Sequence, residues 1–177
     1  MPKKFSLPLL SEVFADPAQA GGEEATPKKP GVDVARKRLG GRVEAEAKSD
    51  RFAPGQHVTF ERAPGEHGRG VVLHASAGEV HVLLDPTRLR RFAPGELTAE
   101  ATAPGPELAP VAADARVFGL LAEGQEVRYA DGHGALREGR LVERCRYGAL
   151  VLRHEDGVVV AVGFRKLWPA PGFDGLS

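Results

Sequence analysis

The sequence predicts an all-β protein in which one small antiparallel module occurs twice. Residues 55–60, Gly-Gln-His-Val-Thr-Phe, return 69 positions later as Gly-Gln-Glu-Val-Arg-Tyr, and a further glycine follows each copy at the same spacing, at Gly70 and Gly139. A repeat of this length favours two domains over one. The 22 glycines and 14 prolines among 177 residues favour short strands joined by frequent turns over long helices.

The overall composition limits the classes of protein that fit this fold. Lysine and arginine total 24, aspartate and glutamate also total 24, and the formal net charge is therefore zero. A neutral chain has no long-range field that would attract a polyanion. The single cysteine, Cys145, cannot form an intramolecular disulfide, which favours a reducing, cytoplasmic location.

No stretch of the chain is expected to enter a membrane. The apolar patch from Phe5 to Leu10 is too short for a secretion signal, contains Pro8 and leads to no small-residue cleavage site. No other run approaches the ~20 apolar residues that span a bilayer.

Residues 1–51 are expected to form a largely disordered, flexible N-terminal tail. Residues 5–14 form a short apolar motif that is too small to fold alone. It is predicted either to dock on one of the modules or to recruit a partner protein, and the alternative is a poorly ordered terminus. Residues 32–47 tolerate a short helix, but Gly40-Gly41 interrupts them. The candidate contact residues of the motif are Phe5, Leu7, Leu9, Leu10, Val13 and Phe14.

The first module is expected over residues 52–97. Gln56 to Phe60 alternates apolar and polar side chains, as a half-buried strand requires. Further strands are predicted at residues 70–73, 79–84 and 89–92. Residues 98–115 contain three prolines among alanines and are predicted to form a partly extended linker.

The second module is expected over residues 116–171, with a C-terminal tail at 172–177. Its best local signal is Glu155-Asp156-Gly157 between two Val/Leu-rich runs, because glycine supplies the positive φ of a tight hairpin turn. Each copy also reaches a basic pair, an aromatic residue and a proline. These are Arg-Arg-Phe-Ala-Pro at residues 90–94 and Arg-Lys-Leu-Trp-Pro at 165–169, which we align with each other.

The strand-opening pattern Gly-Gln-x-Val-x-aromatic is similar to that of the SH3-like, Tudor and KOW families of small barrels. Residues 52–60, Phe-Ala-Pro-Gly-Gln-His-Val-Thr-Phe, lead to His-Gly-Arg-Gly-Val-Val at 67–72. This stretch resembles the opening of the RNA-polymerase-interacting domain of bacterial CarD-type transcription regulators. The second copy departs from that pattern in its longer third hairpin. The resemblance implies two small SH3-like antiparallel barrels in tandem, and it implies fold more than function.

Two groups of side chains in the modules are candidate partner-binding residues. A guanidinium group can bind a carboxylate or a phosphate through two hydrogen bonds, and tryptophan is frequent in interface hot spots. Cross-strand ion pairs are the alternative role of the arginines. We expect the aromatic residues Phe60, Phe92 and Tyr129 either to line a groove or to fill the cores of the modules. The candidates are Arg88, Arg90 and Arg91 in the first module, and Trp168, Arg165 and Lys166 in the second.

The pattern of reactive side chains does not indicate an enzyme. His57 and His81 are predicted on the solvent side of their strands, and no ligand spacing indicates a metal site. No catalytic motif is present, and Cys145 would be reactive only if it were exposed. We therefore expect no cofactor and no metal.

These observations predict a non-catalytic adaptor of the bacterial cytoplasm, which binds protein partners through its apolar motif or its barrel grooves. The alternative, implied by the resemblance and by the arginine groups, is a nucleic-acid-binding or transcription-associated factor of the Tudor, KOW or CarD type. Whether the protein forms a homo-oligomer stays an open question at this point.

Overall fold

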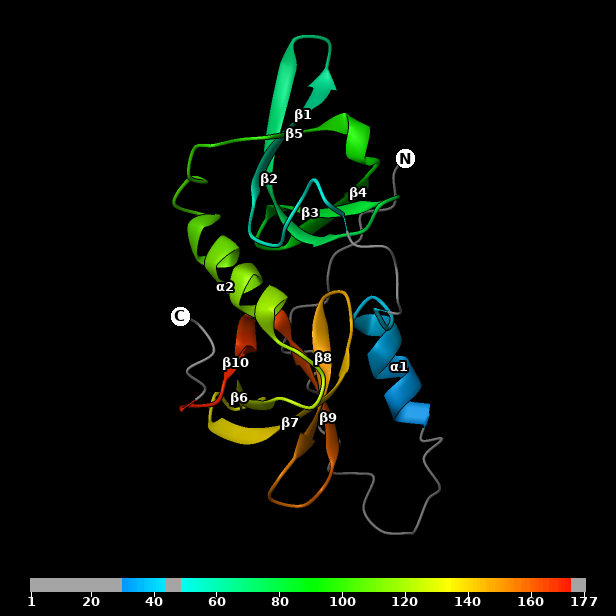
Figure 1. The fold of residues 1–177 in the computed structure, drawn as a ribbon, viewed down its shortest axis with the longest axis vertical. Coiled ribbons are helices and arrows are strands. Elements are labelled where there is room, and N and C mark those ends of the chain that lie inside the picture. The colour runs from blue at the N-terminus through cyan, green and yellow to red at the C-terminus, as the bar shows by residue number, and fades with distance from the viewer. Residues whose placement is uncertain (1–29, 44–48, 173–177) are drawn as a thin grey trace. The chain divides into compact units, whose positions relative to one another are not determined.

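The computed structural model describes residues 30–43 and 49–172, which divide into two compact units (Figure 1). The first unit contains residues 49–120, and the second contains residues 30–43 together with 121–172. Along the chain, the first unit is therefore inserted between the two parts of the second. Each unit has one five-stranded antiparallel sheet and one α-helix, so the prediction of a mostly β protein is confirmed.

The first sheet has the strand order β4-β3-β2-β1-β5, and the 3-10 turn η2 (Pro94–Glu96) joins β4 to β5. Its strands are β1 (His57–Ala63), β2 (Glu66–Ala75), β3 (Val80–Asp85), β4 (Arg88–Phe92) and β5 (Leu97–Ala99). The residues of its inner face are Phe52, Val58, Phe60, Val72, Val80, Val82, Phe92 and Leu97, and all are buried.

The opposite face of this sheet is covered at β2. Val71 packs there against Leu108 and against Ala112 of helix α2 (Ala109–Leu120). A strand that is covered on both faces needs apolar residues at successive positions. This explains why residues 71–73 read Val-Val-Leu and are all buried.

The structure differs from the extended linker predicted over residues 98–115. Leu97–Ala99 is a strand paired with β1, and α2 begins at Ala109. Pro110 is its second residue, a position that tolerates proline because the N–H groups of the first turn have no partner within the helix. The alanines that follow favour the helix, and Val111, Ala112, Ala115 and Phe118 are buried.

The second sheet has the order β10-β6-β7-β8-β9, and η3 (Phe164–Lys166) joins its last two strands. In both sheets the first strand therefore lies between the second and the fifth. Within the described residues, no ladder joins the edge strands of either sheet, so neither sheet is closed into a barrel. The strands are β6 (Glu126–Ala130), β7 (Leu136–Arg144), β8 (Gly148–Arg153), β9 (Val159–Gly163) and β10 (Leu167–Pro169).

Helix α1 (Pro30–Arg38) belongs to the second unit, although a flexible tail is predicted for residues 1–51. The short helix predicted there ends before Gly40-Gly41, as the sequence indicates. Leu39 is 2% exposed and packs against Cys145 and Leu150. Residues 39–43 then run beside the β7–β8 turn, where Tyr147 N donates to the Leu39 carbonyl at 2.9 Å.

The repeated glycine makes the same turn in both units. Gly55 and Gly124 have φ angles of 83° and 85°, a region that glycine enters without steric cost. Their amides donate to the carbonyls of Val72 and Leu141, each at 2.7 Å. The first half of the repeat is therefore a hydrogen-bonded turn that fixes the start of each sheet.

The repeated glutamine closes that turn. The side-chain oxygen of Gln56 accepts a hydrogen bond from Ala53 N at 3.1 Å, and that of Gln125 accepts one from Ala122 N at 3.1 Å. These two glutamines are thus structural in both copies.

The sequence suggests that the C-terminal ends of the two copies align, but in the structure they do not. Val80 pairs with Phe92 in the first sheet, whereas the corresponding Ala149 pairs with Val162 in the second. The offset is therefore 70 after the third hairpin, and residues 90–92 of β4 do not correspond to the stretch containing Trp168. The two basic segments are alike in composition but belong to different elements.

Candidate functional site

The three arginines of β4 have different surroundings. Arg88 forms an ion pair with Asp85, and Arg91 Nη1 lies 3.5 Å from a Glu79 carboxylate oxygen. Arg90 instead lies over two rings, with its Cζ atom 4.8 Å from the Phe92 centroid and 5.8 Å from that of Phe60. Two of the three candidates are thus already paired with carboxylates, whereas Arg90 has no carboxylate partner among the described residues.

The Asp85 turn that holds Arg88 is a strong electrostatic contact. Burial acts to raise the pKa of Asp85, but hydrogen bonds from Thr87 and Arg88 outweigh it and lower the pKa to about 2. Asp85 therefore stays ionised near neutral pH. Arg88 is consequently committed to the β3–β4 turn.

Arg90 borders a groove of about 750 Å³ on the first unit. Phe60 and Phe92, whose ring centroids are 4.7 Å apart, are among its lining residues, and Arg69 of β2 also lines it. Both phenylalanines are at most 4% exposed, so they serve the core as well as the groove. Among the described residues, neither Arg69 nor Arg90 forms an ion pair.

The groove also contains three carboxylates, and each has a partner within the unit. Glu61 accepts a hydrogen bond from Gly65 N at 3.2 Å, Glu96 accepts one from Ala93 N at 2.7 Å, and Glu100 accepts one from the Thr59 hydroxyl at 3.0 Å. The carboxylates are therefore engaged in turns and cross-strand contacts. Among the described residues, the guanidinium groups of Arg69 and Arg90 have no carboxylate partner, and the three carboxylates are bound by neutral donors.

The candidates of the second module lie on and beside β10. Trp168 is half-buried, and Arg128 is its ladder partner on β6. Arg165 and Lys166 lie in η3 and are also partly exposed. These three residues belong to the second unit, whereas the β4 arginines belong to the first. The six candidates of the tail, Phe5, Leu7, Leu9, Leu10, Val13 and Phe14, lie outside the described residues.

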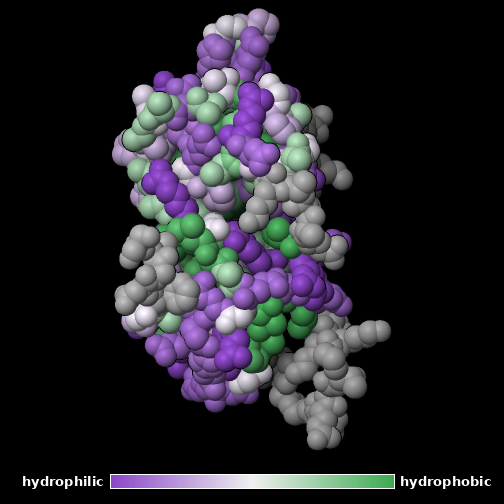
Figure 2. Space-filling view, in the orientation of Figure 1, coloured by the Kyte–Doolittle hydropathy of each residue, from purple (hydrophilic) through white to green (hydrophobic). Residues whose placement is uncertain are grey.

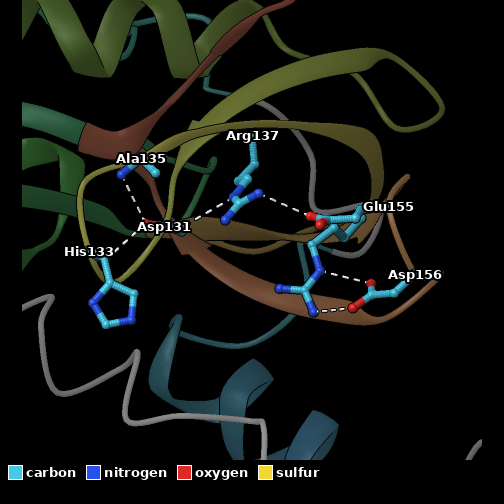
Figure 3. A network of polar contacts seen from close by, with 7 residues as sticks. Asp131, His133, Ala135, Arg137, Glu155 and Asp156 are labelled. Atoms are coloured by element: carbon cyan, nitrogen blue, oxygen red, sulfur yellow. Dashed lines mark hydrogen bonds and ion pairs between the residues drawn. The ribbon is translucent and has the colours of Figure 1, made fainter.

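Most other arginines of the second unit are held by ion pairs or carbonyls. Figure 3 shows Arg137 between Asp131 and Glu155. Its guanidinium nitrogens lie 3.1 Å from each carboxylate, and Asp131 also accepts hydrogen bonds from the amides of His133 and Ala135, each at 2.9 Å. The hydrogen bond between Arg137 and Asp131 raises the pKa of Arg137. Burial acts to raise the pKa of Asp131, but hydrogen bonds from Arg137 and from the amides of His133 and Ala135 lower it overall. The network links the β6–β7 loop to the β8–β9 hairpin.

A second cluster lies on the open face of the second sheet. Glu126 binds His154 and also Arg140, whose Nε lies 3.1 Å from the carboxylate. Arg146 donates to the Gly40 carbonyl at 2.6 Å. The cross-strand ion pairs considered as the alternative role of the arginines are thus present in this unit.

Cys145 is buried under Leu39 and is not a reactive thiol. Burial, together with the nearby Glu143 carboxylate, raises the pKa of the Cys145 thiol to about 12. The thiolate that nucleophilic chemistry needs is therefore scarce at neutral pH.

The prediction that His57 and His81 face solvent is wrong. They are 6% and 3% exposed. His57 Nδ1 lies 3.0 Å from the carbonyl oxygen of Thr102, and His81 Nε2 lies 3.1 Å from Glu79. Strand alternation identified the face correctly, but it does not show that other segments cover that face. In the described part of the chain, no group of three or more His, Cys, Asp or Glu side chains could hold a metal ion.

The visible surface of both units is a mixture of hydrophilic and hydrophobic side chains (Figure 2). No helix of the described residues is long and apolar enough to cross a membrane.

Neither a protein-family model nor a curated protein matches the chain. Sequence reasoning named Arg90 together with Arg88 and Arg91, without distinguishing them, and missed Arg69, which has no counterpart in the repeated pattern.

Proposed function

We propose that each unit has the SH3-like fold, with its five-stranded sheet left open rather than closed into a barrel, and that the protein is a non-catalytic adaptor. In support of the fold, both units have five strands in the same order and a 3-10 turn between the fourth and the fifth. These features agree with the SH3-like, Tudor and KOW barrels that the sequence resembles. A cytoplasmic location is part of the same proposal.

The observation that carries the adaptor function is the position of Arg90. It is stacked over Phe60 and Phe92 at the border of the groove, and it has no carboxylate partner among the described residues. A guanidinium group held by aromatic rings loses little side-chain entropy when it binds a ligand. Arg90 is therefore prepared to receive an acceptor from outside the chain.

The ligand that fits this groove best is a peptide segment that carries a carboxylate. Arg69 and Arg90 supply donors for the carboxylate, and the groove's own acids are already hydrogen-bonded. Binding of acidic protein segments is thus the function that the groove supports best.

Nucleic-acid binding is the second candidate, because Arg69 and Arg90 could also bind phosphates. Sequence-tolerant binding of single strands relies on exposed aromatic faces on which bases stack. Phe60 and Phe92 are 3% and 4% exposed, and Arg90 lies over both rings. This burial favours the peptide over the nucleic acid.

The test is selection of random linear peptides on the full-length chain, followed by affinity measurement with Arg90→Ala and Arg88→Ala proteins. Selected peptides should contain aspartate or glutamate. Arg90→Ala should weaken their binding by about tenfold or more, as expected for loss of a charge-assisted hydrogen bond. Arg88→Ala is the matched control, because it lies on the same strand but is paired with Asp85.

Equal affinity of the two variants would rule out the proposed role of Arg90, and selected peptides without acids would rule out the ligand class. Binding of single-stranded DNA with an affinity that falls steeply with salt would instead support the second candidate. The apolar motif at residues 5–14 stays a prediction as a further partner-binding element of the adaptor.

A further inference from the structure

The edge strand β9 of the second sheet differs from the strand at the same place in the first sheet. By their pairing with β3 and with β8, Arg90 and Arg91 of β4 correspond to Val160 and Ala161 of β9. Charged side chains on an edge strand keep it from pairing with another chain. Residues 158–163, by contrast, read Val-Val-Val-Ala-Val-Gly and contain neither a charge nor a proline. The first copy thus protects an edge that the second copy leaves unprotected.

The remaining two sheet edges are protected in other ways. β5 and β10 are each three residues long, and β10 ends in Pro169, which has no N–H group to donate. Short strands and proline are devices by which proteins prevent pairing at a sheet edge. Among the described strands, β9 is therefore the one edge without such a device.

β9 also presents main-chain groups along this edge. The Arg153 amide donates to the Val158 carbonyl at 2.9 Å, and the Phe164 amide donates to the Tyr147 carbonyl at 3.0 Å. Hydrogen-bonded and non-hydrogen-bonded pairs alternate along an antiparallel ladder, and the β8–β9 ladder between these bonds is regular. Residues 158, 160 and 162 therefore bond to β8, whereas the N–H and C=O groups of residues 159 and 161 point away from it. None of the described residues pairs with these outward groups.

The side chains around this edge are apolar on both faces of the sheet. Val159 and Ala161 are partly buried and pack against the cluster that contains Leu39. Val160 lies on the opposite face by strand alternation and is also partly exposed. Figure 2 shows a hydrophobic patch on the second unit over β9. A strand that pairs here would therefore complete the ladder and cover apolar surface on both faces.

The charges at the two ends of β9 indicate which strand fits. Glu155 lies five residues before Val160, and Arg165 lies five residues after it. Asp156 adds to the acidic end, and Lys166 adds to the basic end. When two copies of β9 run antiparallel about a two-fold axis at Val160, the acidic end of each copy meets the basic end of the other. In a parallel pair, like charges would meet at both ends, which is unfavourable.

We propose that β9 pairs with β9 of a second copy of this chain, so that the two five-stranded sheets join in a homodimer. Val159 of each copy exchanges main-chain hydrogen bonds with Ala161 of the other. The two Val160 side chains face each other in a non-hydrogen-bonded pair, where side chains are closest. A two-fold interface is closed, so the assembly stops at two copies. This proposal concerns the second unit and does not depend on the peptide groove of the first.

The first experiment measures the mass of the full-length protein by analytical ultracentrifugation over a range of concentrations. The wild type should approach the mass of two 18.8 kDa chains. Val160→Arg introduces the residue type that the first copy carries at this position, and it places like charges directly opposite each other. It should weaken the dimer by about fivefold or more. Val142→Arg is the matched control, because Val142 is 46% exposed but lies on the inner strand β7.

A cysteine at the proposed two-fold axis tests the register. The Cα atoms of a non-hydrogen-bonded pair are about 4.5 Å apart, which is within the range of a disulfide. A mild oxidant should therefore convert Val160→Cys into a covalent dimer faster than it converts Val142→Cys. The native Cys145 is 0% exposed and does not compete. Equal rates of cross-linking overturn the proposed pairing.

Hydrogen exchange of the wild type makes the test independent of the folding of any variant. The amides of Val159 and Ala161 should exchange more slowly as the protein concentration rises. Protection in a monomer at every concentration would show that a segment of the same chain covers the edge, and rapid exchange at every concentration would leave the edge to a peptide partner. Either result overturns the proposal, as does a species larger than a dimer or equal dimer affinity of Val160→Arg and Val142→Arg.

Discussion

Gly70 and Gly139 lie at equivalent points of the two sheets, where the neighbouring strand comes too close for a side chain. A Cβ atom on Gly70 would lie 2.4 Å from Val82 Cγ1 and 2.7 Å from the Leu83 carbonyl oxygen. On Gly139 it would lie 2.5 Å from the Leu152 carbonyl oxygen. A backbone atom of a paired strand cannot move aside without breaking the ladder. The second glycine of the repeat is thus explained by close packing.

Gly70→Ala should therefore destabilise the first unit by about 1–3 kcal/mol, the usual cost of overpacking. Urea unfolding followed by circular dichroism measures this change. Gly78→Ala is the control, because no atom lies within 4 Å of a Cβ built there. Equal midpoints for the two variants would contradict the steric explanation.

We expect Cys145 to make the stability of the second unit sensitive to alkaline pH. Its thiol pKa is raised to about 12 by burial, so between about pH 9 and about pH 12 the folded state keeps a proton that the unfolded state loses. Below about pH 9 the thiol does not reduce the free energy of unfolding. Above that pH the free energy of unfolding falls, by about 2 kcal/mol at about pH 10.5.

Unfolding of the wild type and of Cys145→Ala at neutral and alkaline pH measures this effect. The variant should show a smaller loss of stability over the same pH interval, because other groups titrate equally in both proteins. Rapid reaction of Cys145 with a thiol reagent under native conditions would show that the thiol is not buried in solution.

The residues that sequence reasoning identified best are those with local roles. Val58 and Phe60 fill a core and the repeated glycines set turns, because strand alternation and turn chemistry act over a few residues. The burial of His57 depends on Thr102, which is far away in sequence, and so no local pattern reveals it. The different surroundings of Arg88 and Arg90 likewise depend on the side chains of other strands.

At the scale of elements, α1 shows how a short helix is stabilised by what it packs on. Arg36 binds both oxygens of Glu143, at 2.5 and 3.0 Å, and this hydrogen bonding raises the pKa of Arg36. Leu39, next to the helix, contributes the buried apolar contact with Cys145. A helix of nine residues is marginal by itself, so these contacts hold it in place.

Leu39→Ala should accordingly destabilise the second unit by about 2–5 kcal/mol, as truncation of a buried leucine does. Hydrogen exchange should increase in residues 30–43 and in β8. Val34→Ala is the control within α1, because Val34 is 51% exposed. If Leu39→Ala leaves exchange of residues 30–43 unchanged, the packing of Leu39 does not hold this segment.

The elements themselves were only partly predictable. The strands follow from alternation and turn residues, and the short helix before Gly40-Gly41 was expected. Residues 109–115 of α2 fall in the predicted linker, because residues 98–115 contain three prolines and almost no large apolar residue. The burial of Phe118 and Val111, which favours the helix, requires the rest of the first unit and is absent from the local sequence.

At the scale of the whole molecule, the internal repeat predicted two modules, and the two sheets share one strand order. What the repeat does not indicate is which sheet each helix packs on. α1 precedes the first sheet in the chain but belongs with the second, and α2 precedes the second sheet but belongs with the first. Such pairing depends on surface complementarity between distant segments.

This exchange of helices has a consequence for the order in which the protein folds during synthesis. Arg36 leaves the ribosome early, but its partner Glu143 is 107 residues further along the chain. The first unit is completed by residue 120, so it can fold while α1 still has nothing to bind. When the first unit folds, the chain between residue 43 and β7 becomes compact instead of forming a long flexible loop. The entropy cost of bringing residues 30–43 onto β7 and β8 is then lower. Mutations that slow the folding of the first unit should therefore also delay the folding of the second unit.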